Sequence, residues 1–184
     1  MSKPRKTSHE EQQFEAWCEE AVAAGLLSAY EHPPATWELL PAQSVPVTVQ
    51  LKTKCKTVWR HLCREHKYTP DFRLQLTLAG VQALHDALGK VVLTDHYKDT
   101  RTVYVDTKGA FTVQRGQDQM FQCNRKMVYA QHGIWVRKVV PRDWFCATWC
   151  PEAYRWMKSR KVPTLTKAGE KAGTVDEFMR RAIK

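Results

Sequence analysis

The chain has 184 residues, 43% of them hydrophobic, which fits one globular domain with a sizeable core. Its 29 Lys and Arg residues outnumber 19 Asp and Glu residues, and the formal charge of +10 favours nucleic acid over a membrane as partner. No apolar run approaches the roughly 20 residues of a membrane span, and the start lacks the apolar segment of a signal peptide, so we expect a cytoplasmic protein.

The first predicted element is an amphipathic helix. Residues 1–7 are basic and are expected to form a disordered arm. Ser8-His9-Glu10-Glu11 has the pattern of a capping box with Ser8 as N-cap, and Gly25 is a natural stop. Apolar residues recur between them at helical spacing: Phe14, Trp17, Cys18, Ala21 and Val22. Glu10 and Glu11 both lie about 50° from the centre of this stripe, so periodicity does not choose which of them faces a site.

Residues 28–50 contain four prolines between apolar stretches at 37–40 and 45–51, which predicts strands interrupted by turns. A basic run follows, opposed only by Glu65: Lys52, Lys54, Lys56, Arg60, Arg64 and Lys67. Such a run is typical of a solvated face. Because Trp59 and His61 are interleaved with it, the run also suits a phosphate backbone, and Lys52, Lys54 and Lys56 are candidate DNA-binding residues.

Two predicted strands carry a possible catalytic constellation. Pro70 disfavours helix before it, and the alternation after Asp71 predicts a strand over residues 72–76. Thr102 to Val105 is β-branched and aromatic, which is typical of a strand, and the alternation of strand side chains places Asp106 and Lys108 on one side. If the two strands are adjacent, Asp71, Asp106 and Lys108 meet at one point.

Two close carboxylates attract a hard divalent cation, and a neighbouring lysine can orient or deprotonate a water molecule. The alternative is an exposed ion pair at a strand end beside an unrelated Pro-Asp turn. Asp106 follows Asp71 by 35 residues, which include a predicted helix over residues 79–88 and a turn near Gly89. The other acids of this insertion are expected to be loop charges: Asp86, Asp95 and Asp99.

A helix over residues 117–131, ended by Gly133, and a strand over residues 134–140 are predicted after Lys108. Strand, helix and strand in succession favour an α/β fold with a mixed central sheet flanked by helices. The core is expected to end near Pro141. On the helix, either Gln122 or Lys126 could add a polar site residue, and no spacing rule decides between them. Arg125 and Lys126 are further candidate DNA-binding residues.

The tail from Trp144 onwards is aromatic and basic. Its aromatic side chains either stack on bases or bury the edge of the sheet, and we favour burial. Thr174-Val175-Asp176-Glu177 predicts a second capping box and a terminal helix. The six cysteines include no Cys-x-x-Cys pair, so free thiols are expected rather than disulfides, and Cys146 and Cys150 lack the partner pair of a zinc site.

Pro70-Asp71 followed by Asp106-Thr107-Lys108 at the end of a hydrophobic strand resembles the PD-(D/E)xK nuclease superfamily. Tyr-Thr-Pro-Asp-Phe at residues 68–72 and Val-Asp-Thr-Lys-Gly at residues 105–109 are similar to the same segments of phage Holliday-junction endonucleases. The resemblance implies a restriction-endonuclease-like core over residues 8–141, with residues 142–184 as an extension packed on it. The 35-residue separation is longer than in the phage enzymes.

The resemblance implies a Mg²⁺- or Mn²⁺-dependent deoxyribonuclease that hydrolyses phosphodiester bonds, with branched DNA as one substrate. Asp71 and Asp106 would hold the metal, the Thr107 carbonyl would complete its shell, and Lys108 would position the attacking water. The phage enzymes carry their first-helix glutamate as Ser-x-x-Glu, which selects Glu11 over Glu10 to support the metal site.

The expected partner is DNA and not a membrane, and the sequence leaves open whether the protein forms a homodimer. The resemblance to phage enzymes also suggests that the protein is encoded by a phage and acts in a bacterial host. Two other functions stay open from the sequence. One is a nuclease acting on linear or single-stranded ends, and the other is a non-catalytic DNA-binding protein that retains the fold. Cleavage of junction, linear and single-stranded DNA in Mg²⁺ separates these functions.

Overall fold

The computed structural model describes residues 7–88, 101–116, 118–156 and 164–182. Several predictions concern residues that lie outside this part of the chain: residues 1–6 of the basic N-terminal segment 1–7, the turn near Gly89, and the loop charges Asp95 and Asp99.

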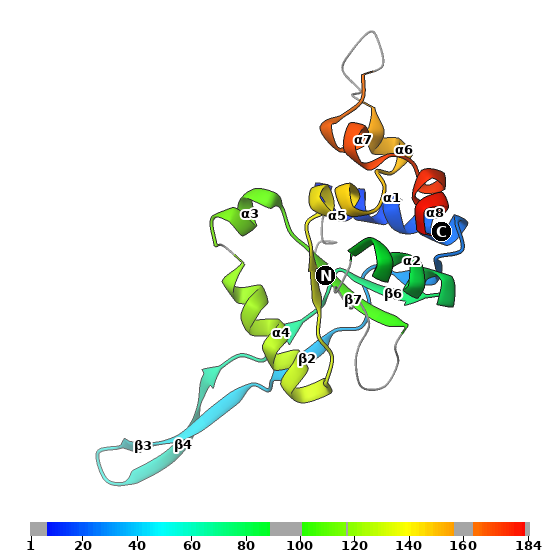
Figure 1. Ribbon diagram of the computed structural model, residues 1–184. Helices are drawn as coiled ribbons and strands as arrows, with labels where there is room; N and C mark the ends of the chain where they lie inside the picture. Colours follow the sequence, from blue (N-terminus) through cyan, green and yellow to red (C-terminus); the bar gives the residue numbers. More distant parts are fainter. Residues whose placement is uncertain (1–6, 89–100, 117, 157–163, 183–184) are drawn as a thin grey trace.

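The described chain begins with one helix followed by a run of strands, mixes helices and strands in its middle, and ends in helices (Figure 1). In chain order they are α1 His9–Ala23, β1 Leu27–Glu31, β2 Trp37–Leu40, β3 Gln43–Gln50, β4 Cys55–Cys63, β5 His66–Tyr68, β6 Phe72–Leu76, α2 Leu78–Leu88, β7 Thr102–Thr107, α3 Ala110–Gln114, α4 Gln119–His132, β8 Arg137–Val139, α5 Pro141–Ala147, α6 Glu152–Arg155, α7 Lys167–Ala172 and α8 Val175–Ala182.

The predicted start and stop of α1 are confirmed. The Glu11 backbone N–H donates to Ser8 Oγ at 3.1 Å, and Ser8 Oγ also lies 3.1 Å from Glu11 Oε1. Gly25 follows the helix with a φ of +72°, a left-handed conformation that glycine adopts without a steric penalty. The cap fixes the first turn of α1, and with it the direction in which Glu10 and Glu11 leave the helix.

The predicted second capping box is also present. The Thr174 backbone N–H donates to Glu177 Oε2 at 2.8 Å, and the Glu177 backbone N–H donates to Thr174 Oγ1 at 3.2 Å. The predicted helix over residues 79–88 corresponds to α2, and because Asp86 lies within it, the expectation that Asp86 is a loop charge is wrong. The helix predicted to end at Gly133 is α4, where Gly133 has a φ of +69°.

The main sheet has four strands in the order β1-β6-β7-β8. The first three pair antiparallel, and β8 pairs parallel with β7, so the predicted α/β class with a mixed sheet is confirmed. The last strand is shorter than predicted and covers only residues 137–139. It stops early because Pro141 opens α5 with Val140 as its N-cap, and residues 134–136, predicted as strand, precede it without strand pairing.

Two apolar clusters flank the sheet. The first cluster joins the buried faces of α1, α2, α5 and α8 to β6 and β7, with Phe14, Trp17 and Phe72 among its largest members. The second cluster lies under α4 and contains Leu39 of β2 and Tyr68 of β5. Since side chains alternate along a strand, β7 contributes side chains to both clusters. Val103 and Val105 pack in the first cluster, and Tyr104 packs against the second.

The tail aromatics that precede α6 are packing residues. Trp149 is fully buried and stacks on Trp17 with ring centroids 4.7 Å apart, and its Nε1 donates to Glu20 at 2.9 Å. Trp144 and Phe145 lie in the same first cluster. These three side chains are therefore not available to stack on bases, whereas Trp156 is partly exposed.

Because Trp149 is stacked and hydrogen-bonded in the core, Trp149→Ala is expected to lower the free energy of unfolding by about 3–5 kcal/mol. Urea denaturation measures the change. Trp59→Ala is the control, since Trp59 is 73% exposed and its loss is expected to cost less than about 0.5 kcal/mol. Equal losses in the two variants would contradict this assignment of Trp149 to the core.

The strands predicted between residues 28 and 50 are present as β1, β2 and β3, but not all of them join the main sheet. β2 pairs with β5, and β3 pairs with β4 in a separate two-stranded ribbon that projects from the body of the protein (Figure 1). We call residues 43–63, which form this ribbon, the arm. Lys52, Lys54 and Lys56 lie at or beside its turn and are all exposed.

All six cysteines lie in the described part of the chain and are free thiols, as predicted. In that same part, no helix is both long and apolar enough to cross a membrane.

Candidate metal-dependent hydrolytic site

The register of β6 and β7 brings the two predicted carboxylates together. Phe72 pairs with Val105, so Asp71 and Asp106 occupy the next positions along the antiparallel pair. The Asp71 backbone N–H extends the ladder by donating to the Val105 carbonyl at 3.0 Å. Both carboxylates are buried, with exposed fractions of 3% for Asp71 and 4% for Asp106. Two acids that lie 35 residues apart in the sequence thus share one end of the sheet.

Thr107 holds the Asp71 carboxylate. Its backbone N–H and its Oγ1 both donate to Asp71 Oδ2, at 2.8 Å and 2.9 Å. The sequence predicts a role only for the Thr107 carbonyl, which stays a prediction. The hydrogen bonds made by Thr107 orient Asp71 from the neighbouring strand.

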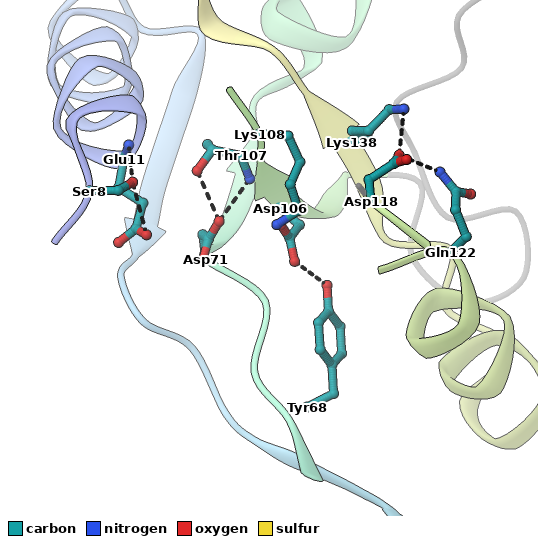
Figure 2. Close-up of polar contacts among 10 residues, drawn as sticks. All are labelled: Ser8, Glu11, Tyr68, Asp71, Asp106, Thr107, Lys108, Asp118, Gln122 and Lys138. Atoms are coloured by element: carbon teal, nitrogen blue, oxygen red, sulfur yellow. Dashed lines mark hydrogen bonds and ion pairs between the residues drawn. The ribbon is translucent and has the colours of Figure 1, made fainter. Parts of the chain in front are cut away.

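Asp106 has a different partner on each oxygen (Figure 2). Tyr68 donates its hydroxyl to Oδ2 at 2.6 Å, and the Lys108 ammonium contacts Oδ1. The predicted placement of Asp106 and Lys108 on one side of the strand is therefore confirmed. About a quarter of the Lys108 side chain remains exposed, so its ammonium can be reached from outside.

The surroundings of Asp106 shift its protonation. Burial, and then the nearby charge of Asp71, raise the pKa of Asp106 above its ordinary value, while Lys108 and Tyr68 act in the opposite direction. Burial and the Asp106 charge also raise the pKa of Tyr68, so its hydroxyl stays protonated and keeps donating. A cation beside both carboxylates would relieve the repulsion between them, which is the electrostatic condition of a metal site.

The first-helix glutamates lie on two sides of this end of the sheet. Glu11 is 5% exposed, and its Oε2 lies 3.7 Å from His32 Nε2. His32 Nδ1 donates to the Asp71 carbonyl oxygen at 2.7 Å, so His32 connects Glu11 to the backbone of Asp71. Glu10 approaches the strand end instead. A Cβ at Gly109 would lie 2.9 Å from Glu10 Oε1, so glycine permits this close approach.

A polar cluster on the other side of Asp106 involves one of the two predicted α4 candidates. Lys138 pairs with Asp106 in the parallel register, and its Nζ lies 2.9 Å from Asp118 Oδ2. Gln122 Nε2 donates to the same oxygen at 2.8 Å (Figure 2). Gln122 therefore connects to the strand beside Asp106, whereas Lys126 is exposed on α4.

The candidate DNA-binding residues fall in two places. Arg125 is half-buried, with its guanidinium carbon 5.3 Å from the centre of the Phe121 ring and 4.3 Å from that of Trp135. Lys108 Nζ also lies over the Phe121 ring, at 5.4 Å, so Arg125 and the catalytic candidates border the same aromatic side chain. Lys52, Lys54 and Lys56 are on the arm, away from this region.

Sequence reasoning missed three residues that position the site: His32, Tyr68 and the Thr107 side chain. Tyr68 and Thr107 lie inside the quoted motifs, and the need of a buried tyrosine hydroxyl for a partner could have indicated Tyr68. No sequence pattern singles out His32. Sequence reasoning also missed the ion pair of Asp118 with Lys138, because these residues approach each other only when α4 folds against β8.

Among the described residues, no group of three or more His, Cys, Asp or Glu side chains is placed to hold a metal ion. The donor set is thus Asp71 and Asp106, to which the resemblance adds the Thr107 carbonyl. Magnesium is typically held by one or two carboxylates and keeps several waters, whereas structural zinc needs four protein ligands. Each carboxylate oxygen has two lone pairs, so the existing bonds of Asp106 leave acceptor capacity. The donor set fits Mg²⁺ or Mn²⁺.

Comparison of the chain with protein-family models, with curated proteins and with solved structures found no match. The function proposed below therefore rests on the geometry of the site and on the resemblance of its motifs.

Proposed function

We propose that the protein is a metal-dependent DNA endonuclease with a restriction-endonuclease-like core, acting in the cytoplasm. The observation that carries the proposal is the pairing of β6 with β7, which sets the buried Asp71 and Asp106 side by side with Lys108 in contact with Asp106. This arrangement is the one that the resemblance to PD-(D/E)xK nucleases requires of these three residues. The positive net charge of the chain suits a DNA substrate.

Asp71 and Asp106 would hold Mg²⁺ or Mn²⁺, which supplies Lewis acidity and lowers the pKa of a bound water. Thr107 keeps Asp71 in place through two hydrogen bonds, and Tyr68 does the same for Asp106. Lys108 donates hydrogen bonds to the attacking water or to the phosphate. The water releases one proton to solvent as its oxygen forms a bond to phosphorus, the bond from phosphorus to the leaving oxygen breaks, and the leaving oxygen takes up a proton from solvent, so that one water is consumed.

Glu11 is proposed to support the same site. Its carboxylate is buried close to His32, which in turn donates to the backbone of Asp71. Glu11 therefore adds negative charge near Asp71 and increases the attraction for a cation. In this role it orients the groups around the metal or supports a second metal.

The test of the proposal is cleavage by the purified protein of junction, linear duplex and single-stranded DNA, each in Mg²⁺ and in Ca²⁺. Cleavage in Mg²⁺ but not in Ca²⁺ is expected. Preference for the junction would identify a junction endonuclease, and preference for linear or single-stranded ends would identify the alternative nuclease. Binding of DNA with no cleavage of any substrate in Mg²⁺ or Mn²⁺ would overturn the proposal and leave a non-catalytic DNA-binding protein.

Tyr68→Phe is expected to move the acid limb of the cleavage profile to higher pH. Metal binding needs ionised Asp106, so cleavage falls as pH decreases through the pKa of Asp106. The Tyr68 hydroxyl stabilises the ionised form, and its removal raises that pKa further. Cleavage rates measured across pH give the shift. Tyr104→Phe, on the same strand as Asp106, is the control, and an acid limb that moves equally in both variants would exclude the Tyr68 bond as the cause.

A further inference from the structure

The arm has an unusual composition for an exposed element. It carries Lys52, Lys54, Lys56 and Arg60 and contains no Asp or Glu, and Arg64 follows directly. It also holds several of the most exposed large apolar side chains of the described chain, including Trp59 at 73% and Leu62 at 65%. A two-stranded hairpin is marginally stable alone in water, so a surface with both features is expected to be covered by a partner.

The residues of the arm indicate what kind of partner this is. In the register of β3 and β4, Val45 pairs with Arg60 and Val49 pairs with Lys56, so cations and valines share one face. A second copy of the arm on that face would bring like charges together. Pro46 on one edge and lysine on the other also disfavour the addition of a strand from another chain. A polyanion that accepts both cations and apolar side chains fits this surface better.

We propose that the arm binds in the major groove of a DNA duplex that flanks the cleaved phosphate. The major groove is about 12 Å wide and admits a two-stranded β-ribbon, and its thymine methyl groups accept apolar contacts. Lysine and arginine at the margins of such a ribbon reach the phosphates. This inference rests on the proposed function for the identity of the substrate, and it adds a requirement for duplex DNA beside the site.

The position of the arm predicts how much duplex is needed. The arm is connected through β2 and β5, and Tyr68 at the end of β5 bonds directly to Asp106. The nine residues of β4 extend the arm by about 30 Å, at about 3.3 Å per residue. One turn of B-DNA is about 34–36 Å, or about 10 base pairs, so the lysines at the tip meet the duplex about one turn from the cut.

The test compares the wild-type protein with a variant whose arm is shortened. Because Val45 and Arg60 face each other, residues 46–59 can be replaced by Asn-Gly, which closes the pair with a two-residue turn. Affinity is measured in Ca²⁺ for duplexes of about 8 and about 20 base pairs. The shorter duplex is too short to reach from the active site to the tip of the arm, and the longer duplex spans both. The shortened variant is expected to lose at least about 10-fold in affinity for the long duplex and little for the short one.

A second variant keeps the test valid if the shortened protein fails to fold. Lys52→Ala, Lys54→Ala and Lys56→Ala together should flatten the plot of log affinity against log salt by up to about 2.7, at about 0.9 per phosphate contact, on the long duplex. A control removes the same charge from the C-terminal helices, where the side chains are also exposed: Lys167→Ala, Lys171→Ala and Arg180→Ala. The control should keep the wild-type slope.

Three results would overturn the inference. The first is an unchanged affinity and salt slope on the long duplex, and the second is an equal loss on single-stranded DNA. The third is a loss of oligomeric state, with a dimeric wild type and a monomeric shortened variant in solution, which would make the arm an interface between copies. Failure of the proposed function is distinguished from failure of this inference. Duplex binding that depends on the arm, without cleavage in Mg²⁺, would refute the nuclease function and support the role of the arm. Cleavage in Mg²⁺ with duplex binding that does not depend on the arm would support the nuclease function and refute the role of the arm.

Discussion

Asp106→Ala and Lys108→Ala are each expected to lower the rate of DNA cleavage by more than about 100-fold while DNA binding stays largely intact. Asp106 is the buried carboxylate that both Lys108 and Tyr68 contact, and its loss removes half of the proposed metal donor set. Loss of Lys108 removes the cation beside the reacting phosphate. Binding depends mainly on the basic surfaces, which neither variant changes by more than one charge. Cleavage and binding are measured on the same substrate, in Mg²⁺ and Ca²⁺ respectively.

Matched controls exclude a general effect of losing one charge. Asp143→Ala and Lys167→Ala remove an exposed acid and an exposed lysine and should cleave like the wild type. The melting temperature of each variant shows whether it is folded. Wild-type cleavage by a folded Asp106→Ala or Lys108→Ala variant would show that the proposed site is wrong.

Glu11→Gln is expected to reduce cleavage strongly and to raise the Mg²⁺ concentration needed for half-maximal rate, with a nearly unchanged melting temperature. A glutamine can keep the contact with Ser8 at the helix start, so the cap costs little. The negative charge near His32 and Asp71 is lost, and with it part of the attraction for the cation. A metal titration of the cleavage rate separates weaker metal binding from a slower reaction.

Glu10→Gln is the matched control on the same helix turn. Glu10 lies against Gly109, whereas it is Glu11 that lies beside His32, so the Glu10 variant should be mild. If Glu10→Gln were the inactive variant, the family-derived choice between the two glutamates would be off by one position. If both variants cleaved normally, α1 would be structural and the site would depend on Asp71, Asp106 and Lys108 alone.

Local sequence patterns predicted the helix ends and the strand faces well. Capping boxes act within four residues, so Ser8 and Glu11, and Thr174 and Glu177, could be recognised directly. Alternation within one strand was enough to place Asp106 and Lys108 together. The register that pairs Phe72 with Val105 was not readable, because it depends on how two distant strands pack against α1 and α5.

Composition was a weaker guide where the same residues suit two environments. Trp144 and Trp149 among cations fit either base stacking or a core, and only the packing against Trp17 decides for the core. The basic run precedes the Pro-Asp motif directly in the sequence. In the structure Lys52, Lys54 and Lys56 lie at the tip of the arm, because β3 and β4 pair only with each other among the described strands, whereas Lys67 lies on β5.

Calorimetric titration with Mn²⁺ tests the central claim most directly, because it asks whether the paired carboxylates hold a metal ion before any DNA is present. The wild-type protein is expected to bind Mn²⁺ saturably, and the variant with both Asp71→Asn and Asp106→Asn is expected to show no such binding while remaining folded. Equal binding by the two proteins, or no binding by the wild type either alone or with uncleaved DNA, would contradict a metal site at this end of the sheet.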